Sequence, residues 1–394
     1  MTPAFRLYQA ARFLTTVGIQ MVSVAVGWAI YERTGRVLDL GFVGLAQFLP
    51  AFVLSPITGQ VVDRVERRRI LMVCQLLFAI VAIALSQELS LEATYALLVL
   101  LGTARAFAAP TTSSLLSATV ERPDLPRAIA YGSTLWQIAA VLGPLAGGGI
   151  YALPLGARGV FATSAVCFFI ALVLTTKLRT APQQFERRAI SIETLVAGVR
   201  YVWQQRILLG AISLDLFAVL FGGAVSMMPA FAKDVLHTGA WGLGLLRAAP
   251  AIGAGLVAFF LARRPLRRKA GSIMFAAVTL FGLFTILFAV SNWLPLSLFA
   301  LAGLGAADMV SVVIRSSLIQ LATPDELRGR VSAVNLVFVG ASNELGEFES
   351  GLMAAWLGLI PSVIMGGAST LLVVLIWWTL FPSLRKADAL DRTS

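Results

Sequence analysis

The sequence predicts an all-α integral membrane protein, with twelve transmembrane helices arranged as two pseudo-symmetric six-helix halves. Three observations lead to this prediction. The 394 residues are 58% hydrophobic and only 13% charged, whereas a soluble domain is about one quarter charged. Twelve apolar runs are long enough to cross a bilayer, and the last six resemble the first six at a nearly constant offset along the chain.

The same composition excludes several classes of function. A net charge of +11 is typical of nucleic-acid binders, but so apolar a chain lacks densely exposed Lys and Arg, and we expect no nucleic-acid partner. One histidine, His237, and two cysteines inside apolar runs, Cys74 and Cys167, do not make a metal site or a catalytic triad. We therefore expect no enzymatic activity, no catalytic residue, no metal and no cofactor.

Each predicted spanning helix is a run of about 20 largely apolar residues. In chain order, the runs are 8–31, 40–61, 70–88, 94–117, 128–152, 158–177, 207–230, 241–262, 271–290, 295–320, 331–357 and 361–382. The first run is not a cleavable signal, because it is too long and carries Arg12. Residues 1–176 therefore form the first six-helix half, and residues 207–394 form the second.

Residues 177–206 form a predicted cytoplasmic linker, because the apolar pattern stops there and polar residues take over. Within the linker, apolar residues recur at helical spacing from Ile192 to Trp203, after a possible N-cap at Ser191. This pattern predicts a short amphipathic helix on the membrane surface. For residues 200–206, an extra turn at the start of the seventh span is an equally open interpretation.

The distribution of Lys and Arg predicts the orientation of the chain. An even number of spans puts both termini on one side, and the most basic loops, at residues 64–69 and 263–269, lie on that side as well. The opposite loops carry only Arg33, Arg36, Arg158 and Lys233. The positive-inside rule therefore places both termini in the cytoplasm. It also puts four residues of an aromatic belt near the outer ends of their helices, namely Trp28, Trp241, Trp293 and Trp356.

An internal repeat relates the two halves. Gly44-Leu45 and Pro50-Ala51 recur 200 residues later as Gly244-Leu245 and Pro250-Ala251. At an offset of 203, Gly102, Arg127 and Gly148 correspond to Gly305, Arg330 and Gly351. Two related six-span halves joined by a linker are typical of secondary transporters, whose substrate site lies near the membrane midplane.

Two motifs resemble signatures of the major facilitator superfamily, and the resemblance covers essentially the whole chain. Residues 59–68, GQVVDRVERR, are similar to the loop signature G-x-x-x-D-R-x-G-R-R after the second helix, with Glu66 where glycine is usual. Residues 143–148, GPLAGG, resemble the fifth-helix signature of exporters that exchange substrate for protons. Residues 105–110 and 324–331 resemble the branch of siderophore and drug exporters.

The resemblance implies that both motifs gate a conformational change. The residues expected to do so are Gly59, Asp63, Arg64, Arg67 and Arg68 in the loop, Gly143, Pro144, Gly147 and Gly148 in the fifth helix, and Arg330. Asp63 is expected to cap the start of the eleventh helix near Arg330 in one state. The glycines are expected to admit another backbone closely and so close one side of the pathway. A topology-setting basic loop and generic close packing are the alternatives.

Ionisable side chains inside spans are the strongest functional signal, because burying a charge is costly. There are eight of them, namely Arg105, Asp215, Arg247, Asp308, Arg315, Glu344, Glu347 and Glu349. We expect five to bind substrate or to couple its movement to protons, namely Arg105, Asp215, Asp308, Glu344 and Glu347. Arg105 and Asp308 are equivalent in the repeat, which favours an ion pair that protonation or substrate breaks.

Glu344 and Glu347 lie three residues apart on one face of the eleventh helix, whereas Glu349 points about 160° away. Two carboxyl groups so close together do not both ionise easily, so one of them can carry a proton or pair with a cationic substrate. A structural network, in which these acids pair with Arg247, Arg315 or each other, is the alternative. Asp215 is expected either to line a cavity or to bind loop arginines.

The sequence therefore predicts a secondary active transporter of the bacterial inner membrane. It exports a small organic compound, such as a siderophore or drug, in exchange for protons by alternating access. Its expected partners are the substrate, protons and the lipid bilayer, and it is expected to act as a monomer. An importer or uniporter of a small solute and a lysolipid translocase stay open as alternatives.

Overall fold

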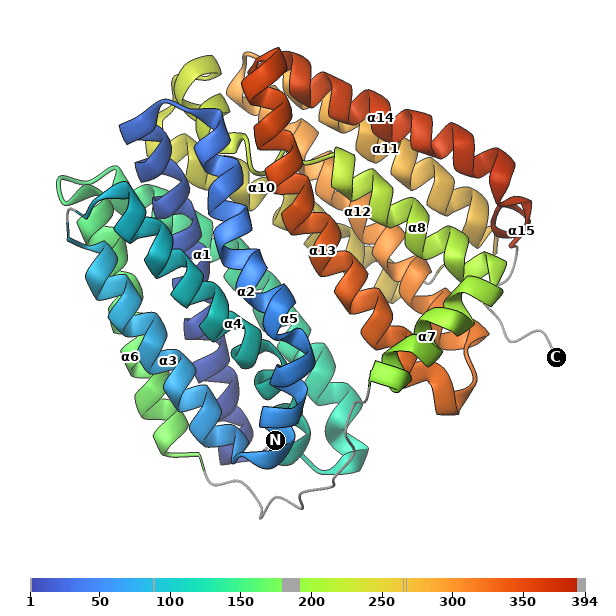
Figure 1. Cartoon of the computed structure of the whole chain (residues 1–394), viewed down its shortest axis with the longest axis horizontal. Helices are drawn as coiled ribbons and strands as arrows, with labels where there is room; N and C mark the ends of the chain where they lie inside the picture. The colour runs from blue at the N-terminus through green and yellow to red at the C-terminus, as the bar shows by residue number, and fades with distance from the viewer. Residues whose placement is uncertain (1, 88, 179–191, 265, 267, 388–394) are drawn as a thin grey trace. The chain divides into compact units, whose positions relative to one another are not determined.

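The computed structural model describes residues 2–87, 89–178, 192–264, 266 and 268–387 (Figure 1). In this part of the chain, ten helices are long and apolar enough to cross a membrane, and there are eleven if one bent pair is counted as a span. The prediction of an all-α, multi-pass membrane protein is confirmed. Each of the twelve predicted apolar runs contains a helix, although two of these helices depart from a simple apolar span.

The first six runs form six continuous helices. They are α1 (Pro3–Thr34), α2 (Val37–Arg64), α3 (Arg67–Leu85), α4 (Leu91–Thr119), α5 (Leu125–Tyr151, after the 3₁₀ turn η1, Arg122–Asp124) and α6 (Gly156–Thr176). α1 begins where the Thr2 hydroxyl accepts a hydrogen bond from the backbone N–H of Phe5, at 3.1 Å. It ends at Gly35, whose φ of 62° is the left-handed conformation that glycine adopts most readily.

The second half holds the remaining helices. They are α8 (Arg206–Phe221), α9 (Met228–Ala230), the π turn η2 (Phe231–Val235), α10 (Gly239–Arg263), α11 (Ala270–Val290), α12 (Leu294–Ala322), α13 (Asp325–Leu357), α14 (Leu359–Leu380) and α15 (Pro382–Arg385). α13 is long enough to span but is not among the ten apolar spans. Three glutamates in its second half lower its hydropathy, and these are acids that the sequence singles out for function.

The seventh run is not the single helix predicted for residues 207–230, because α8 stops at Phe221. Two glycines follow, and both are packed too closely to carry a side chain. A Cβ on Gly222 would lie 2.4 Å from the Phe281 ring, and one on Gly223 would lie 2.2 Å from Oγ of Ser350. Glycine also destabilises a helix interior by about 1 kcal/mol relative to alanine, so the helix breaks at this pair.

The amphipathic helix expected in the linker is α7 (Ile192–Gln204). Its last seven residues, from Gly198, are bent by 104° from α8, so α7 is a separate helix and not an extra turn of the seventh span. α7 packs closely on α13, as a distance at Gly198 shows: a Cβ on this residue would lie 3.0 Å from the carbonyl oxygen of Arg330. The Tyr201 hydroxyl also donates a hydrogen bond to the carbonyl of Ala322, at 2.8 Å. Its position on a membrane surface stays a prediction.

The chain divides into two compact units (Figure 1). Unit 1 comprises Met1–Gly35, Leu45–Ile190 and Thr238–Ala248, and unit 2 comprises Arg36–Gly44, Ser191–His237 and Ala249–Ser394. In unit 1, α1 packs against α5 and α6, and α3 packs against α4 and α6. In unit 2, α11 packs against α12 and α14, and α8 packs against α13 and α14. The first residues of α2 and of α10 thus join the unit formed mainly by the other sequence half.

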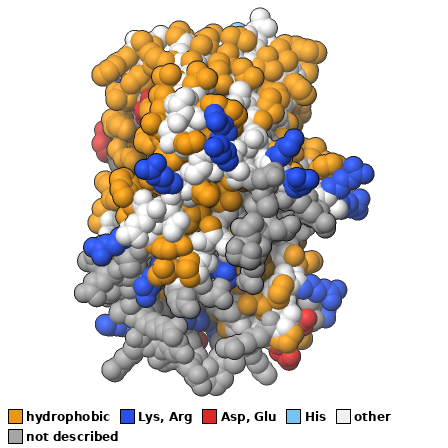
Figure 2. Space-filling model, turned by 90° about the vertical axis from the view of Figure 1, so that its right-hand side faces the viewer, with side chains coloured by type: hydrophobic (Ala, Val, Ile, Leu, Met, Phe, Trp, Pro, Cys, Tyr) orange, Lys and Arg blue, Asp and Glu red, His pale blue; other side chains and the backbone are white. Residues whose placement is uncertain are grey.

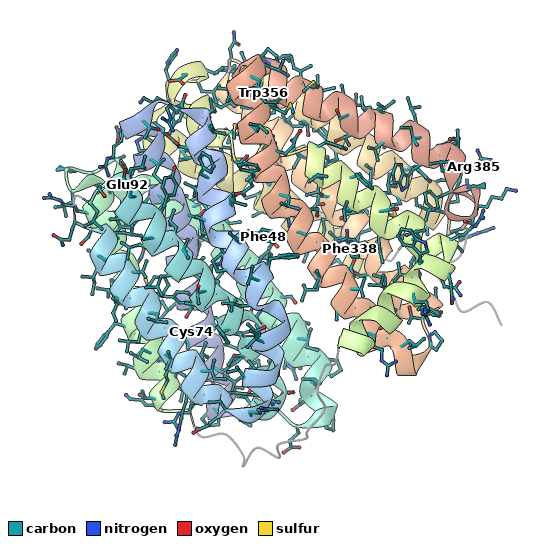
Figure 3. The ribbon with its side chains drawn as sticks, viewed as in Figure 1. Phe48, Cys74, Glu92, Phe338, Trp356 and Arg385 are labelled. Atoms are coloured by element: carbon teal, nitrogen blue, oxygen red, sulfur yellow. The ribbon has the colours of Figure 1, made fainter. Side chains whose placement is uncertain are left out.

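Many large apolar side chains are exposed on the helices, as a lipid-facing surface requires. Figure 2 shows one face on which hydrophobic side chains dominate the upper part and Lys and Arg gather lower down. Three tryptophans of the predicted belt are exposed, including Trp356, which is labelled in Figure 3. The prediction for Trp28 is wrong, because its side chain is only 6% exposed. It packs edge-on against Tyr151, with ring centroids 6.4 Å apart.

Candidate functional site

A buried ion pair joins α8 to α12 in unit 2. The carboxylate of Asp215 accepts a hydrogen bond from Nη1 of Arg315 and a second one, at 2.8 Å, from the hydroxyl of Ser311. The side chains of Asp215 and Arg315 are 6% and 4% exposed. The sequence predicts that Asp215 lines a cavity or binds loop arginines, whereas its partner in the structure is an arginine inside a span, Arg315. The contact ties the two helices together in a region of low dielectric.

Asp308 lies one helical turn before Ser311 on α12, on the same face as Ser311 and Arg315. In contrast to Asp215, Asp308 makes no hydrogen bond or ion pair with any side chain that the structure describes. Its neighbours on α12 pack tightly, since a Cβ on Gly305 would lie 2.0 Å from the carbonyl oxygen of Pro250. An acid at such a site gains little from being charged, so taking up a proton is a natural way to neutralise it.

Arg105, the repeat equivalent of Asp308, lies in unit 1. Its Nη1 donates a hydrogen bond to Oε1 of Gln47 on α2, at 3.0 Å. The amide of Gln47 is neutral, so this contact orients the guanidinium without balancing its charge. An ion pair between Arg105 and Asp308 stays a prediction.

A second arginine inside a span, Arg247 on α10, also belongs to unit 1. Its Nη1 donates a 2.6 Å hydrogen bond to the hydroxyl of Ser23 on α1. In the repeat, Arg247 corresponds to Gln47 at the offset of 200 residues. The two equivalent positions on α2 and α10 therefore both carry polar side chains that bind within unit 1.

Glu347 lies against the start of α2 within unit 2. A Cβ on Gly44 would lie 2.7 Å from Oε2 of Glu347 and 3.1 Å from its Cβ. In the repeat, Glu347 takes the place of Pro144, so the acid stands where the first half has an apolar residue. The side chain of Glu344 lies outside the described part of the structure, and Glu349 is partly buried.

The basic loop after α2 is held by one contact with the end of α6 and one within the loop itself. Arg68 donates a hydrogen bond to the carbonyl of Thr176, at 2.7 Å, at the end of α6. Glu66, which stands where the superfamily signature has glycine, pairs with Arg69 at 2.7 Å. The side chain of Asp63 lies outside the described part of the structure, and Gly59 and Arg64 lie in the last turns of α2. Contact between Asp63 and the start of α13 near Arg330 stays a prediction.

The glycines of α5 face two different helices of unit 1. A Cβ on Gly143 would lie 2.5 Å from Cβ of Gln20, and one on Gly147 would lie 3.1 Å from Cα of Met21, both on α1. The adjacent Gly148 faces α10, where its Cβ would lie 2.8 Å from Cα of Gly244. These distances are the close backbone approach that glycine permits.

The repeat produces an equivalent crossing in unit 2. Gly351, which corresponds to Gly148, faces α2, and a Cβ on it would lie 2.9 Å from Cα of Gly41. In unit 1, a Cβ on Gly244 would lie 2.7 Å from the carbonyl oxygen of Pro144. In unit 2, the equivalent glycine is Gly44, and the residue beside it is Glu347, the repeat equivalent of Pro144. The crossings of α5 with α10 and of α13 with α2 are therefore related, but only the second contains a carboxylate.

The crossing at Gly148 gives a first prediction. Gly148→Ala is expected to destabilise the packed arrangement by about 1–3 kcal/mol, because the added methyl group meets backbone atoms that cannot give way easily. The matched control is Gly149→Ala, since a Cβ on Gly149 meets nothing within 4 Å. Thermal unfolding of the purified proteins in detergent measures the difference. Equal unfolding midpoints for the two variants would contradict this description of the crossing.

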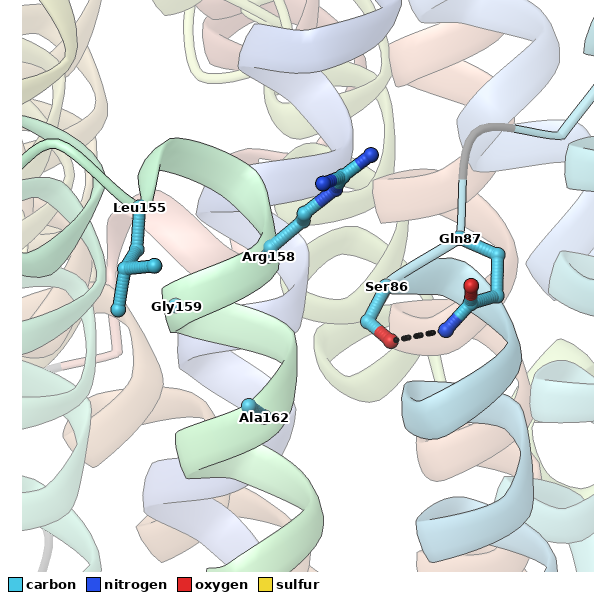
Figure 4. Close-up of a pocket in the computed structure, with 6 residues that line it drawn as sticks. All are labelled: Ser86, Gln87, Leu155, Arg158, Gly159 and Ala162. Carbon is cyan, nitrogen blue, oxygen red and sulfur yellow. Dashed lines mark hydrogen bonds between the residues drawn. The ribbon is translucent and has the colours of Figure 1, made fainter.

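Other features of the described residues do not join these candidates. A pocket of about 330 Å³ lies between the end of α3 and the start of α6, lined by Ser86, Gln87, Leu155, Arg158, Gly159 and Ala162 (Figure 4). It contains none of the predicted site residues. Cys74, labelled in Figure 3, and Cys167 are both free. Among the residues described, no cluster of three or more His, Cys, Asp or Glu side chains is placed to hold a metal ion.

The family model described as Major Facilitator Superfamily matches residues 10–346. This chain belongs to the major facilitator superfamily. Members of this superfamily are transporters, which confirms the prediction that the chain is not an enzyme.

Relatives of this facilitator align over nearly its whole length. The enterobactin exporter EntS of Citrobacter koseri is 27% identical, over 98% of this chain and 93% of that protein. EntS of Escherichia coli O1:K1 is 26% identical with the same coverage. Among solved structures, a bacterial homologue of the lysosomal transporter Spinster aligns with a TM-score of 0.75 at 15% identity, over 98% of this chain and 97% of that one. A POT family transporter in complex with 5-aminolevulinic acid gives 0.77 at 12% identity, over 97% and 96%. These likenesses in structure show the fold.

The sequence did not predict several residues that contact the charged side chains inside the spans. The charged side chains inside the spans make hydrogen bonds with three such residues, Gln47, Ser23 and Ser311. A single amide or hydroxyl in an apolar run forms no recognisable sequence pattern. Asp39 was also missed, although it is buried near the start of α2 and pairs with Arg36 at 2.8 Å. The three-residue spacing of Arg36 and Asp39 is the signal that identifies this pair.

Proposed function

We propose that this protein exports a small organic compound, such as a siderophore or drug, in exchange for protons by alternating access. The observation that carries the proposal is Asp308, an acid in the middle of a spanning helix that has no counter-charge among the described side chains. The names of the relatives, exporters that align over nearly the whole chain, support the direction and the siderophore class.

In the proposed cycle, protonation and substrate loading alternate at the acids of unit 2. An ionised Asp308 accepts hydrogen bonds from hydroxyl or amine groups of the substrate, whereas a protonated Asp308 accepts them poorly. A proton arriving from outside therefore releases the substrate, and loss of that proton to the cytoplasm restores the loading site. Glu347 and Glu344 are proposed to share the proton traffic. Asp215 contributes through its fixed pair with Arg315 and is the weakest of the four candidates.

The gating residues fit the same cycle as a proposal. The crossings at Gly148 and Gly351 hold one side closed, and the loop of Gly59, Asp63 and the arginines that follow acts on the other side, with Arg330 as its expected neighbour. We place both termini in the cytoplasm, with the protein in a bacterial inner membrane. We propose that it acts as a monomer with domain boundaries at residues 176 and 207.

Transport by purified protein in liposomes tests this proposal. Candidate siderophores, cationic drugs and lysolipids are added one at a time while a pH gradient, with the lumen more acidic than the medium, is imposed. Uptake of each radiolabelled compound from the medium into the lumen is measured. We expect one of the small organic compounds to accumulate in the acidic lumen only while the gradient lasts.

The alternatives give different results in the same experiment. A uniporter equilibrates its substrate with or without the gradient, and an importer that moves protons with its substrate accumulates it with the gradient reversed. A lysolipid translocase moves lysolipid between leaflets and none of the soluble compounds. Any of these three patterns would contradict proton-coupled export.

A further inference from the structure

The loop between α10 and α11 is the second-half copy of the basic loop after α2, and it has lost its acids. At the repeat offset of 200 residues, Arg263 replaces Asp63 and Leu266 replaces Glu66. Residues 263–269 therefore carry five basic side chains and no acidic one. The ion pair that Glu66 makes within the first loop cannot form in its copy. The second loop is thus uniformly positive.

The helices that flank this loop bring no acid to it. The chain has no Asp or Glu between Asp234 and Asp308, nor between Glu349 and Asp388. These segments contain α10, α11, α14 and α15. Within the described part of the chain, the side chains of the arginines at positions 263, 264 and 385 make no ion pair. Asp388 lies outside the described residues. The positive charge of this end of unit 2 is therefore directed at something outside its own helices.

Three guanidinium groups at this end of unit 2 stack on aromatic rings. From Cζ to the ring centroid, the distances are 4.1 Å for Arg263 on Phe259, 5.8 Å for Arg264 on Phe260 and 5.1 Å for Arg385 on Trp378. The two phenylalanine side chains are more than half exposed, as lipid-facing side chains are. A guanidinium stacked by its face keeps its N–H donors in the plane, directed past the edge of the ring.

The start of α11 joins this loop to α15. The backbone N–H of Gly271 donates a hydrogen bond to the carbonyl of Ala387, at 3.0 Å. A Cβ on Gly271 would lie 3.3 Å from the carbonyl carbon of Arg385, which Figure 3 shows at the opposite end of α14 from Trp356. The loop and α15 thus form one surface, which we call the basic surface of unit 2. Its described basic residues are Arg263, Arg264, Arg268, Lys269, Arg385 and Lys386.

The backbone of Lys269 is in an unusual conformation for a lysine. Its φ of 59° lies in the left-handed region that favours glycine. Among the residues described, only His237 and Lys269 combine a side chain with a positive φ. The side chain of Lys269 is exposed, so packing does not explain it. The turn into α11 does not require a lysine, which indicates a use for its ammonium group.

We infer that the basic surface of unit 2 binds the phosphate of an anionic phospholipid, in the leaflet that this end of the unit reaches. The exposed rings place the guanidinium groups at the edge of the hydrocarbon region, which is the depth of lipid phosphates. The arginine fork matches two phosphate oxygens, and the negative surface potential of anionic lipids complements the charge. In the proposed orientation this leaflet is the cytoplasmic one. The site depends on neither the direction nor the substrate of transport.

Native mass spectrometry of the purified protein in detergent tests this site with three probes. They are phosphatidylglycerol, phosphatidylcholine with the same acyl chains, and glycerol 3-phosphate. The wild-type protein is expected to bind the first molecule of phosphatidylglycerol about tenfold more tightly than phosphatidylcholine. Equal affinity for the two lipids would overturn the inference. Glycerol 3-phosphate bound as tightly as phosphatidylglycerol would also overturn it, because the site would then be one for a free anion.

Arg263→Gln combined with Arg264→Gln is expected to weaken phosphatidylglycerol binding by about tenfold to thirtyfold and to leave phosphatidylcholine binding unchanged. The matched control, Arg33→Gln combined with Arg158→Gln, removes two exposed arginines from unit 1 and should leave both affinities unchanged. Phe259→Leu combined with Phe260→Leu keeps the charges and removes the rings beneath them, which should weaken phosphatidylglycerol binding several-fold. Wild-type affinity in the first double variant would overturn the inference.

Lys269→Gly separates lipid binding from folding. Glycine adopts the left-handed conformation without strain, so the midpoint of thermal unfolding should not fall. The affinity for phosphatidylglycerol should still fall several-fold, because the ammonium group is lost. Size-exclusion chromatography reports whether each variant is folded. If the double arginine variant does not fold, Lys269→Gly decides, and unchanged affinity for phosphatidylglycerol in that variant would overturn the inference.

Discussion

Asp308→Asn is expected to abolish substrate transport driven by a pH gradient while leaving the protein folded. Asparagine has nearly the same shape as aspartate but cannot take up or release a proton. Because Asp308 has no ion-pair partner among the described side chains, its replacement removes no buried counter-charge. Gradient-driven accumulation in liposomes should fall to the level of protein-free vesicles, and the thermal unfolding midpoint in detergent should stay within a few degrees of the wild type.

Two acids of the next helix, α13, make this prediction specific. Glu347→Gln is expected to remove gradient-driven accumulation as well, because Glu347 stands at the crossing of α13 with α2. Glu349→Gln is the matched control, because Glu349 points to another side of the helix. This variant should retain gradient-driven accumulation of the substrate. Unchanged accumulation in both Asp308→Asn and Glu347→Gln would contradict the assignment of the coupling acids.

Asp215→Asn is expected to destabilise the protein by about 3–5 kcal/mol, because it leaves the buried guanidinium of Arg315 without its counter-charge. The midpoint of thermal unfolding in detergent, followed by tryptophan fluorescence, should fall clearly. Transport per folded molecule should fall much less than in Asp308→Asn. This difference separates an ion pair that holds α8 to α12 from an acid that carries the coupling proton.

Two comparisons check the role of this ion pair. Glu66→Gln breaks the ion pair between Glu66 and Arg69, whose side chains are 40% and 74% exposed, respectively. This change should lower the free energy of unfolding by at most about 1 kcal/mol. Combining Asp215→Leu with Arg315→Met removes both charges together and should recover much of the lost stability. A midpoint for Asp215→Asn equal to that of Glu66→Gln would show that the pair contributes nothing special.

Most of the fold follows from the length of the apolar runs, because each spanning helix must be about as long as the bilayer is thick. The break after Phe221 does not follow, since Gly222 and Gly223 stand in a continuous apolar run. The side chains that crowd these glycines, Phe281 and Ser350, come from α11 and α13, far along the chain. Packing between distant helices decided that boundary, and no local pattern reports such packing.

The candidate site shows the same division. The cost of burying charge makes the charged positions visible in the sequence, but it does not identify their partners. Asp215 and Arg315 are 100 residues apart, and the hydrogen-bond partner of Arg105 is a neutral amide in an apolar run. The internal repeat is more informative about packing, because the equivalent glycines Gly148 and Gly351 both lie at helix crossings.

The most direct test of proton-coupled export is the sign of a pH change. Liposomes that contain the purified protein are loaded with an accepted substrate and diluted into substrate-free medium at equal pH, while a trapped dye records the internal pH. Exchange for protons predicts that the lumen becomes more acidic as the substrate leaves, and that Asp308→Asn abolishes this change. Substrate efflux with no pH change, or with a lumen that becomes more alkaline, would contradict the account.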